Sequence, residues 1–73
     1  MNNLEEWQQR VVDEKKELDD KLEKLVQFKY NRMFSALPIH EQERLNTQGH
    51  IMCSYSAILG ERIRHMVTND RAK

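Results

Sequence analysis

The sequence is poor in cysteine, proline and glycine, with one, one and two residues among 73. A single cysteine excludes a disulfide within the chain, and a lone thiol is typical of a reducing compartment. No apolar run reaches the about 20 residues that a membrane-spanning helix needs. The charged N-terminal segment is also unlike a signal peptide. We therefore expect a cytoplasmic protein with no membrane partner.

Hydrophobic residues are scarce as well, at 38% of the chain, whereas 33% of the residues are charged. A domain of this size gains roughly 3–5 kcal/mol from its core, and oligomerisation is a common remedy when disulfides are absent. The sequence therefore predicts a homo-oligomer. A net charge of zero and a pI near 6.8 do not favour nucleic acid as a partner, since nucleic-acid binders carry basic stripes.

The common catalytic motifs are missing from the sequence. It contains no glycine-rich phosphate loop, no CxxC, no HExxH and no GxSxG turn. His50 and Cys53 supply two potential metal ligands, fewer than the three or four protein ligands of zinc sites. We expect a protein that is not an enzyme and that has no metal and no cofactor.

Hydrophobic residues recur every seven positions in the first part of the chain, at Leu4, Val11, Leu18 and Leu25. This period is helical and close to that of a coiled coil. The segment has no glycine or proline, and it has acid-before-base pairs four residues apart, such as Glu6 with Arg10. The pattern predicts a helix over about residues 3–30, followed by a corner over 31–37.

A second helix is expected from about Pro38 to residue 67, with a frayed tail over 68–73. Proline is favoured in the first turn of a helix, where its missing N–H is not needed. The seven-residue repeat then returns at Leu45, Met52, Leu59 and Met66.

The two repeats fit an all-α, antiparallel two-helix hairpin that forms a single domain over residues 1–73. If the chain turns near residue 35, facing residues have numbers that sum to about 70. Four layers then come into register, and Phe34 and Leu37 close the open end of the stack. The predicted layers pair Leu25 with Leu45, Leu18 with Met52, Val11 with Leu59, and Leu4 with Met66.

Small residues form a stripe beside the second hydrophobic repeat. Because glycine costs about 1 kcal/mol relative to alanine inside a helix, the stripe indicates that something packs close to it. The neighbour that packs there could be the predicted helix over residues 3–30 of the same chain, a second subunit or a flat ligand. That helix also carries two valines outside its seven-residue repeat. The candidate close-packing or oligomer residues are Val12, Val26, Gly49, Cys53, Ser56 and Gly60.

Several polar and aromatic residues lie near the predicted seams. Glu14 is expected to hydrogen-bond with Tyr55 across the hairpin, and the Arg62 guanidinium is expected to stack on Trp7. One interpretation is a polar layer that fixes the register. The other is a patch that binds an anion and a base by stacking and by phosphate contacts. The candidate ligand-binding residues are Trp7, Arg10, Glu14, Tyr55 and Arg62.

The order "QRVVDEKKELDDKLEKL", then "LP", "EQERL" and "YSAILGERI" resembles a group of short phage proteins related to a protein of a crAss-like phage. The resemblance covers about residues 7–63 and implies a helical hairpin of phage origin, which would act in the cytoplasm of an infected bacterium. A looser resemblance leads to phage anti-CBASS and anti-Thoeris sponges. Those proteins sequester cyclic-nucleotide or ADP-ribose-derived immune signals between protomers without cleaving them.

These resemblances imply a phage accessory protein that binds such a signalling molecule and counters host defence. The chain lacks the β-rich second region of longer anti-Thoeris members. The alternative is a helical interaction module that docks on a host or phage regulatory protein, with its exposed stripes as the docking surface.

Overall fold

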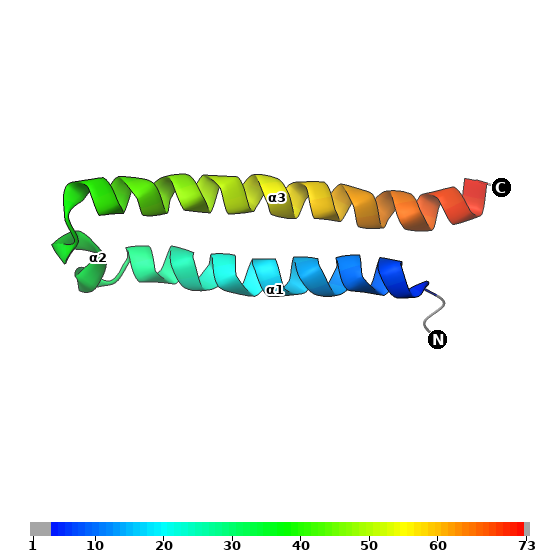
Figure 1. Cartoon of the computed structure of the whole chain (residues 1–73), viewed down its shortest axis with the longest axis horizontal. Coiled ribbons are helices and arrows are strands. Elements are labelled where there is room, and N and C mark those ends of the chain that lie inside the picture. Colours follow the sequence, from blue (N-terminus) through cyan, green and yellow to red (C-terminus); the bar gives the residue numbers. More distant parts are fainter. Residues whose placement is uncertain (1–3, 73) are drawn as a thin grey trace.

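The computed structural model describes residues 4–72, and side chains over residues 4–66. Two long helices, α1 (Glu6–Lys29) and α3 (Ile39–Ala72), run side by side in opposite directions (Figure 1). A five-residue helix, α2 (Arg32–Ala36), lies in the connection between them. The hairpin is elongated, at 54 × 19 × 16 Å. The described part of the chain is therefore all-helical, as the heptad pattern predicts, while assembly into a homo-oligomer stays a prediction.

Polar side chains define where the first two helices begin. At the start of α1, the Gln8 side-chain oxygen accepts a hydrogen bond of 2.8 Å from the Glu5 backbone N–H. Gln8 is nevertheless buried, because its amide oxygen satisfies a backbone donor that the helix leaves unpaired. At the start of α2, the Asn31 side chain accepts from the Met33 N–H at 2.8 Å.

The corner is more ordered than a simple loop. Phe34 of α2 packs edge-on against Phe28 of α1, with ring centroids 5.9 Å apart and planes at 89°. Glu41 and Gln42 donate their backbone N–H groups to the Pro38 carbonyl, so that α3 begins one residue after the predicted start. The Gln42 side chain also donates to the Leu37 carbonyl at 2.9 Å.

The core follows the predicted repeats. Val11, Leu59 and Met66 are the buried hydrophobic residues, and Leu18 and Ile63 pack against them. Leu59 is fully buried, with 0% of its surface exposed. Because a hairpin buries one stripe of each helix, most other side chains remain in contact with solvent.

The register differs from the predicted one by about one helical turn. Gly49, rather than residue 45, lies against Leu25, and Gly60, rather than residue 55, lies against Lys15. Figure 1 shows the reason, since α2 extends past the end of α1 and lies below the first turn of α3. The Gln42 side chain, which donates to the Ser35 carbonyl at 3.2 Å, fixes this arrangement.

The C-terminal boundary also differs from the prediction. The α3 backbone continues to Ala72, beyond the expected end at residue 67, because no glycine or proline follows Gly60 to stop it. Of the expected tail, residue 73 lies outside the described residues. Within the described part of the chain, no helix combines the length and the apolar character needed to cross a bilayer.

Candidate functional site

The small residues of α3 face α1 of the same chain. Gly49 is buried, and a Cβ atom placed on it would lie 3.4 Å from Leu25 Cδ2. A Cβ atom on Gly60 would lie 3.3 Å from Lys15 Cε, which is closer than ordinary van der Waals contact. Of the three partners considered for the stripe, helix 1 therefore occupies the space beside both glycines.

A polar network joins the two long helices beside this stripe. Lys15 Nζ donates to Asp19 Oδ2 at 2.7 Å and to Ser56 Oγ at 3.0 Å. The Ser56 hydroxyl donates in turn to Asp19 Oδ1. The hydrogen bonds from Lys15 and Ser56 stabilise the carboxylate, and they lower the pKa of Asp19 below its usual value of 3.8. This network is a structural link between the helices.

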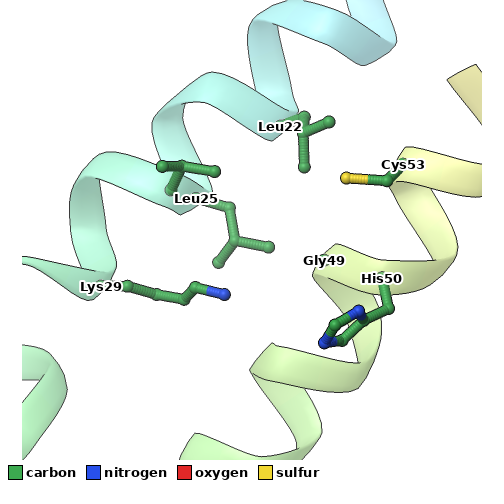
Figure 2. Close-up of a pocket in the computed structure, with 7 residues that line it drawn as sticks. Leu22, Leu25, Lys29, Gly49, His50 and Cys53 are labelled. Carbon is green, nitrogen blue, oxygen red and sulfur yellow. The ribbon is translucent and has the colours of Figure 1, made fainter.

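A groove lies beside the network, between α1 and α3. It has a volume of about 90 Å³. In Figure 2 the Lys29 side chain extends toward Gly49, and the Cys53 sulfur points toward Leu22. Three predicted close-packing residues, Val26, Gly49 and Cys53, thus line one groove, and Cys53 is exposed there. The lining residues are Leu22, Leu25, Val26, Lys29, Gly49, His50 and Cys53.

The five candidate ligand-binding residues are all exposed. Trp7 has 53% of its surface accessible and Tyr55 has 44%. Arg10 forms an ion pair with Glu6 at 3.3 Å, as the spacing of the two residues predicts. All five remain accessible to a binding partner, including Glu14 and Arg62.

The two predicted contacts among these residues are not formed. Among the described side chains there is no hydrogen bond between Glu14 and Tyr55, and Arg62 is not stacked on Trp7. The shift in register explains both differences, because it moves each expected partner by about one turn along α3. The interpretation of these residues as a polar layer within the hairpin is therefore wrong.

Helical geometry places these five residues on one face of the hairpin. At 100° per residue, Trp7 and Val26 lie on opposite sides of the α1 seam, and Tyr55 and Cys53 lie on opposite sides of the α3 seam. Val26 and Cys53 both line the groove. The side chains of Trp7 and Tyr55 therefore belong to the face opposite the groove.

This face contains a second seven-residue repeat on α3, which we call the outer seam. Its residues recur in alternating steps of four and three, and every one is exposed. The middle is apolar, both ends are basic or polar, and none of the seven residues is acidic. The outer seam consists of Arg44, Gln48, Ile51, Tyr55, Ile58, Arg62 and His65.

Sequence reasoning found Tyr55 and Arg62 of the outer seam but missed its apolar residues, and it missed the Lys15 network. The sequence does contain a signal for the outer seam, namely a second seven-residue spacing between Ile51 and Ile58. These residues directly precede Met52 and Leu59 of the repeat that was recognised. The network was missed because Lys15 precedes Asp19, the less favourable order for a helical pair. Its third member, Ser56, was recognised only as a small residue. Val12, the remaining close-packing candidate, is half-buried on α1.

Nothing in the described side chains resembles a metal centre. No three His, Cys, Asp or Glu residues among them are grouped closely enough to share an ion. The structure thus defines a small helical-hairpin protein whose distinctive surfaces are an inner groove and an exposed outer seam.

The family follows from comparison with known proteins. A family model described as Sequestin matches residues 5–65. The chain therefore belongs to the Sequestin family, a name that suggests a sequestering function for its members. No curated protein and no solved structure matches the chain.

Proposed function

We propose that this protein binds and sequesters a nucleotide-derived immune signal, of the cyclic oligonucleotide or cyclic ADP-ribose type. The protein does not cleave the signal, and a phage uses the protein to counter host defence. Membership of the Sequestin family supports the sequestering part of this proposal. The chemistry of the exposed face supports the nucleotide part, and it is the observation on which the choice of ligand depends.

That face offers what a nucleotide needs. Trp7 and Tyr55 present exposed rings on which a base stacks, and Arg62 presents a guanidinium suited to phosphate. The absence of acidic residues from the outer seam favours an anion there. Arg10 adds a further cation on α1, although Glu6 neutralises part of its charge.

The size of the groove argues that the ligand lies between protomers. Small-molecule sites usually have volumes of about 300–1,000 Å³, whereas the groove between α1 and α3 has about 90 Å³. This groove is therefore too small for a cyclic dinucleotide, and the larger, open hollow of about 450 Å³ near the start of α3 is lined by none of the five candidate residues. A second hairpin packed on this face would cover a ligand that lies beside Trp7 and Arg62.

Calorimetry against a panel of cyclic dinucleotides, cyclic trinucleotides and ADP-ribose cyclisation products tests the proposal. We expect one member to bind tightly and to be recovered chemically intact after the complex is heated. Trp7→Ala and Arg62→Ala should each weaken binding ten-fold or more, since a stacked base is worth about 1–3 kcal/mol.

Two exposed residues near the corner supply matched controls. Tyr30→Ala removes a ring that is 88% exposed, and Arg32→Ala removes a cation from α2; neither should change the affinity. If no member of the panel binds at high micromolar concentration, or if the recovered ligand is cleaved, the proposal is wrong.

The exposed apolar centre of the outer seam favours a second candidate, a helical module that docks on a host or phage regulatory protein. Ile51 and Ile58 are 63% and 54% exposed and lie on one helical face, as in groove-binding helices. Recovery of one stoichiometric host protein with the wild type, and its loss with Ile51→Glu, would favour this candidate over ligand sequestration.

A further inference from the structure

We infer that a second copy of this chain packs on the outer seam, with the two α3 helices antiparallel and a twofold axis beside Tyr55. The inference builds on the proposed function, because it identifies a second protomer for the ligand site. It places Tyr55 inside the protein interface and leaves Trp7, with Arg62 at the edge of the interface, for the ligand. The oligomer interface was expected at the small-residue stripe. Two glycines of that stripe already lie against α1, so the inference moves the interface to the outer seam.

The exposed area of a single hairpin is the first argument. A compact protein of 8.8 kDa exposes roughly 4,800 Å². This chain exposes 6087 Å², and much of the surplus comes from its elongated shape. A standard interface buries about 800 Å² on each partner. A dimer of this kind would therefore remove more than half of the surplus.

The pattern of α3 is the second argument, and it selects the face. α3 has two adjacent seven-residue repeats, of which Leu59 and Met66 belong to the buried one. The other repeat places Ile51, Tyr55 and Ile58 on the surface, where nothing in the described chain covers them. A helix with two apolar seams is suited to two helical neighbours, and α1 supplies one of them.

Charge selects a second copy in the antiparallel orientation. The apolar centre is nearly symmetric about Tyr55, with Gln48 seven residues before it and Arg62 seven residues after it. A parallel pair would place each Arg62 beside its equivalent, and like charges repel. An antiparallel pair places Arg62 opposite Gln48 of the other copy, which is a neutral hydrogen-bonding partner. The same patch then serves both subunits, as a closed twofold dimer requires.

Molar mass measured by light scattering and sedimentation tests the interface. The wild type should have the mass of a dimer, or of a multiple of dimers, and Ile58→Glu should shift it to the monomer. Ile39→Glu is the matched control, because Ile39 is 60% exposed at the start of α3 and lies off the outer seam. A monomeric wild type, or an Ile58→Glu variant of unchanged mass, would overturn the inference.

Cysteine cross-linking tests the orientation without a disruptive substitution. In a Cys53→Ser background, Gln48→Cys and Arg62→Cys proteins should form a disulfide-linked heterodimer when mixed under mild oxidation. Neither should cross-link when oxidised alone. Cross-linking of each variant with itself would show a parallel pair, and no cross-linking at all would show that the outer seam is not the interface.

The results also separate the interface from the proposed function. A monomer that still binds a member of the nucleotide panel would leave sequestration standing and overturn the interface. A dimer with the expected cross-links that binds no member of the panel would establish the interface and reject the ligand. Capture of a different protein on the outer seam, with a monomeric free chain, would also overturn the inference.

Discussion

The Ser56 hydroxyl donates a hydrogen bond of 2.5 Å to Oδ1 of Asp19, which lies 37 residues earlier on the other long helix. Lys15 completes the contact by donating to both residues. Apolar stripes tolerate sliding by a turn, because one branched residue replaces another. A network of three complementary polar groups does not tolerate such sliding. The contact therefore favours the observed register of α1 and α3 over registers shifted by one turn.

The first prediction concerns the pH dependence that this network produces. Because the folded chain lowers the pKa of Asp19 below 3.8, the ionised carboxylate stabilises the fold at neutral pH. This contribution is fully present above the usual pKa and is lost as the pH falls through 3.8 toward the lower folded value. Asp19→Asn should therefore be less stable than the wild type at pH 7, and the difference should shrink as the solution is acidified.

Urea unfolding at a series of pH values from 7 to 2 would measure that difference. Asp20→Asn is the control, since Asp20 is an exposed neighbour on the same helix. A gap between Asp19→Asn and the wild type that is equally large at pH 2 would contradict the assignment.

A second prediction contrasts two adjacent residues of α3. Leu59 is fully buried, and Leu59→Ala should cost about 2–5 kcal/mol of stability, enough to unfold much of so small a domain. Ile58→Ala removes a similar side chain that is 54% exposed, and it should leave the helical circular dichroism signal nearly unchanged at high protein concentration. Similar losses of thermal stability in both variants, measured on dilute monomeric samples, would contradict the described core.

A third prediction concerns the two glycines of the small-residue stripe. Gly49→Ala should raise the stability, because alanine gains about 1 kcal/mol of helix propensity and its Cβ would meet Leu25 Cδ2 at 3.4 Å. Gly60→Leu should lower it by about 1–3 kcal/mol, because the larger side chain must displace Lys15 from its network. Thermal unfolding of both variants provides the comparison, and a stabilising Gly60→Leu would show that α1 does not approach there.

A fourth prediction concerns the corner. Phe34→Leu keeps an apolar side chain but removes the edge-on contact with Phe28, which should cost about 0.5–1.5 kcal/mol. Met33→Leu changes a neighbour in α2 that is 68% exposed, and it should cost little. Chemical unfolding of the two variants would test whether the corner contributes to stability, and equal midpoints would show that it does not.

The sequence predicted the helices well because each carries its own periodic signal. Val11, Leu59 and Met66 belong to the recognised repeats, and all three are buried. The register was harder to predict, because it depends on how the corner folds. The loop expected over 31–37 contains α2, whose placement below the first turn of α3 shifts that helix by about one turn. Such a shift keeps both repeats facing each other, so the repeats alone do not reveal it.

The contacts of the candidate site residues were hard to predict for the same reason. Trp7, Tyr55 and Arg62 were expected either in a polar layer inside the hairpin or in a ligand-binding patch, and the structure exposes all three. Their role in ligand binding stays a prediction from residue type, whereas their partners within the hairpin depend on a distance along α3 that local patterns do not encode. Lys15 and Ser56 meet across 41 residues, and such a contact has no signature in a single sequence.

The single corner of this hairpin also orders the events of folding. Contacts close to the corner join residues near in sequence, such as Leu25 and Gly49, which are 24 positions apart, whereas Lys15 and Gly60 are 45 apart. Nearly doubling the loop adds about 0.6 kcal/mol of closure entropy. Contacts next to α2 therefore form at the lowest entropic cost, and each one shortens the loop that the next must close. We therefore expect folding to proceed outward from the Phe28–Phe34 contact, with the ends of α1 and α3 docking last.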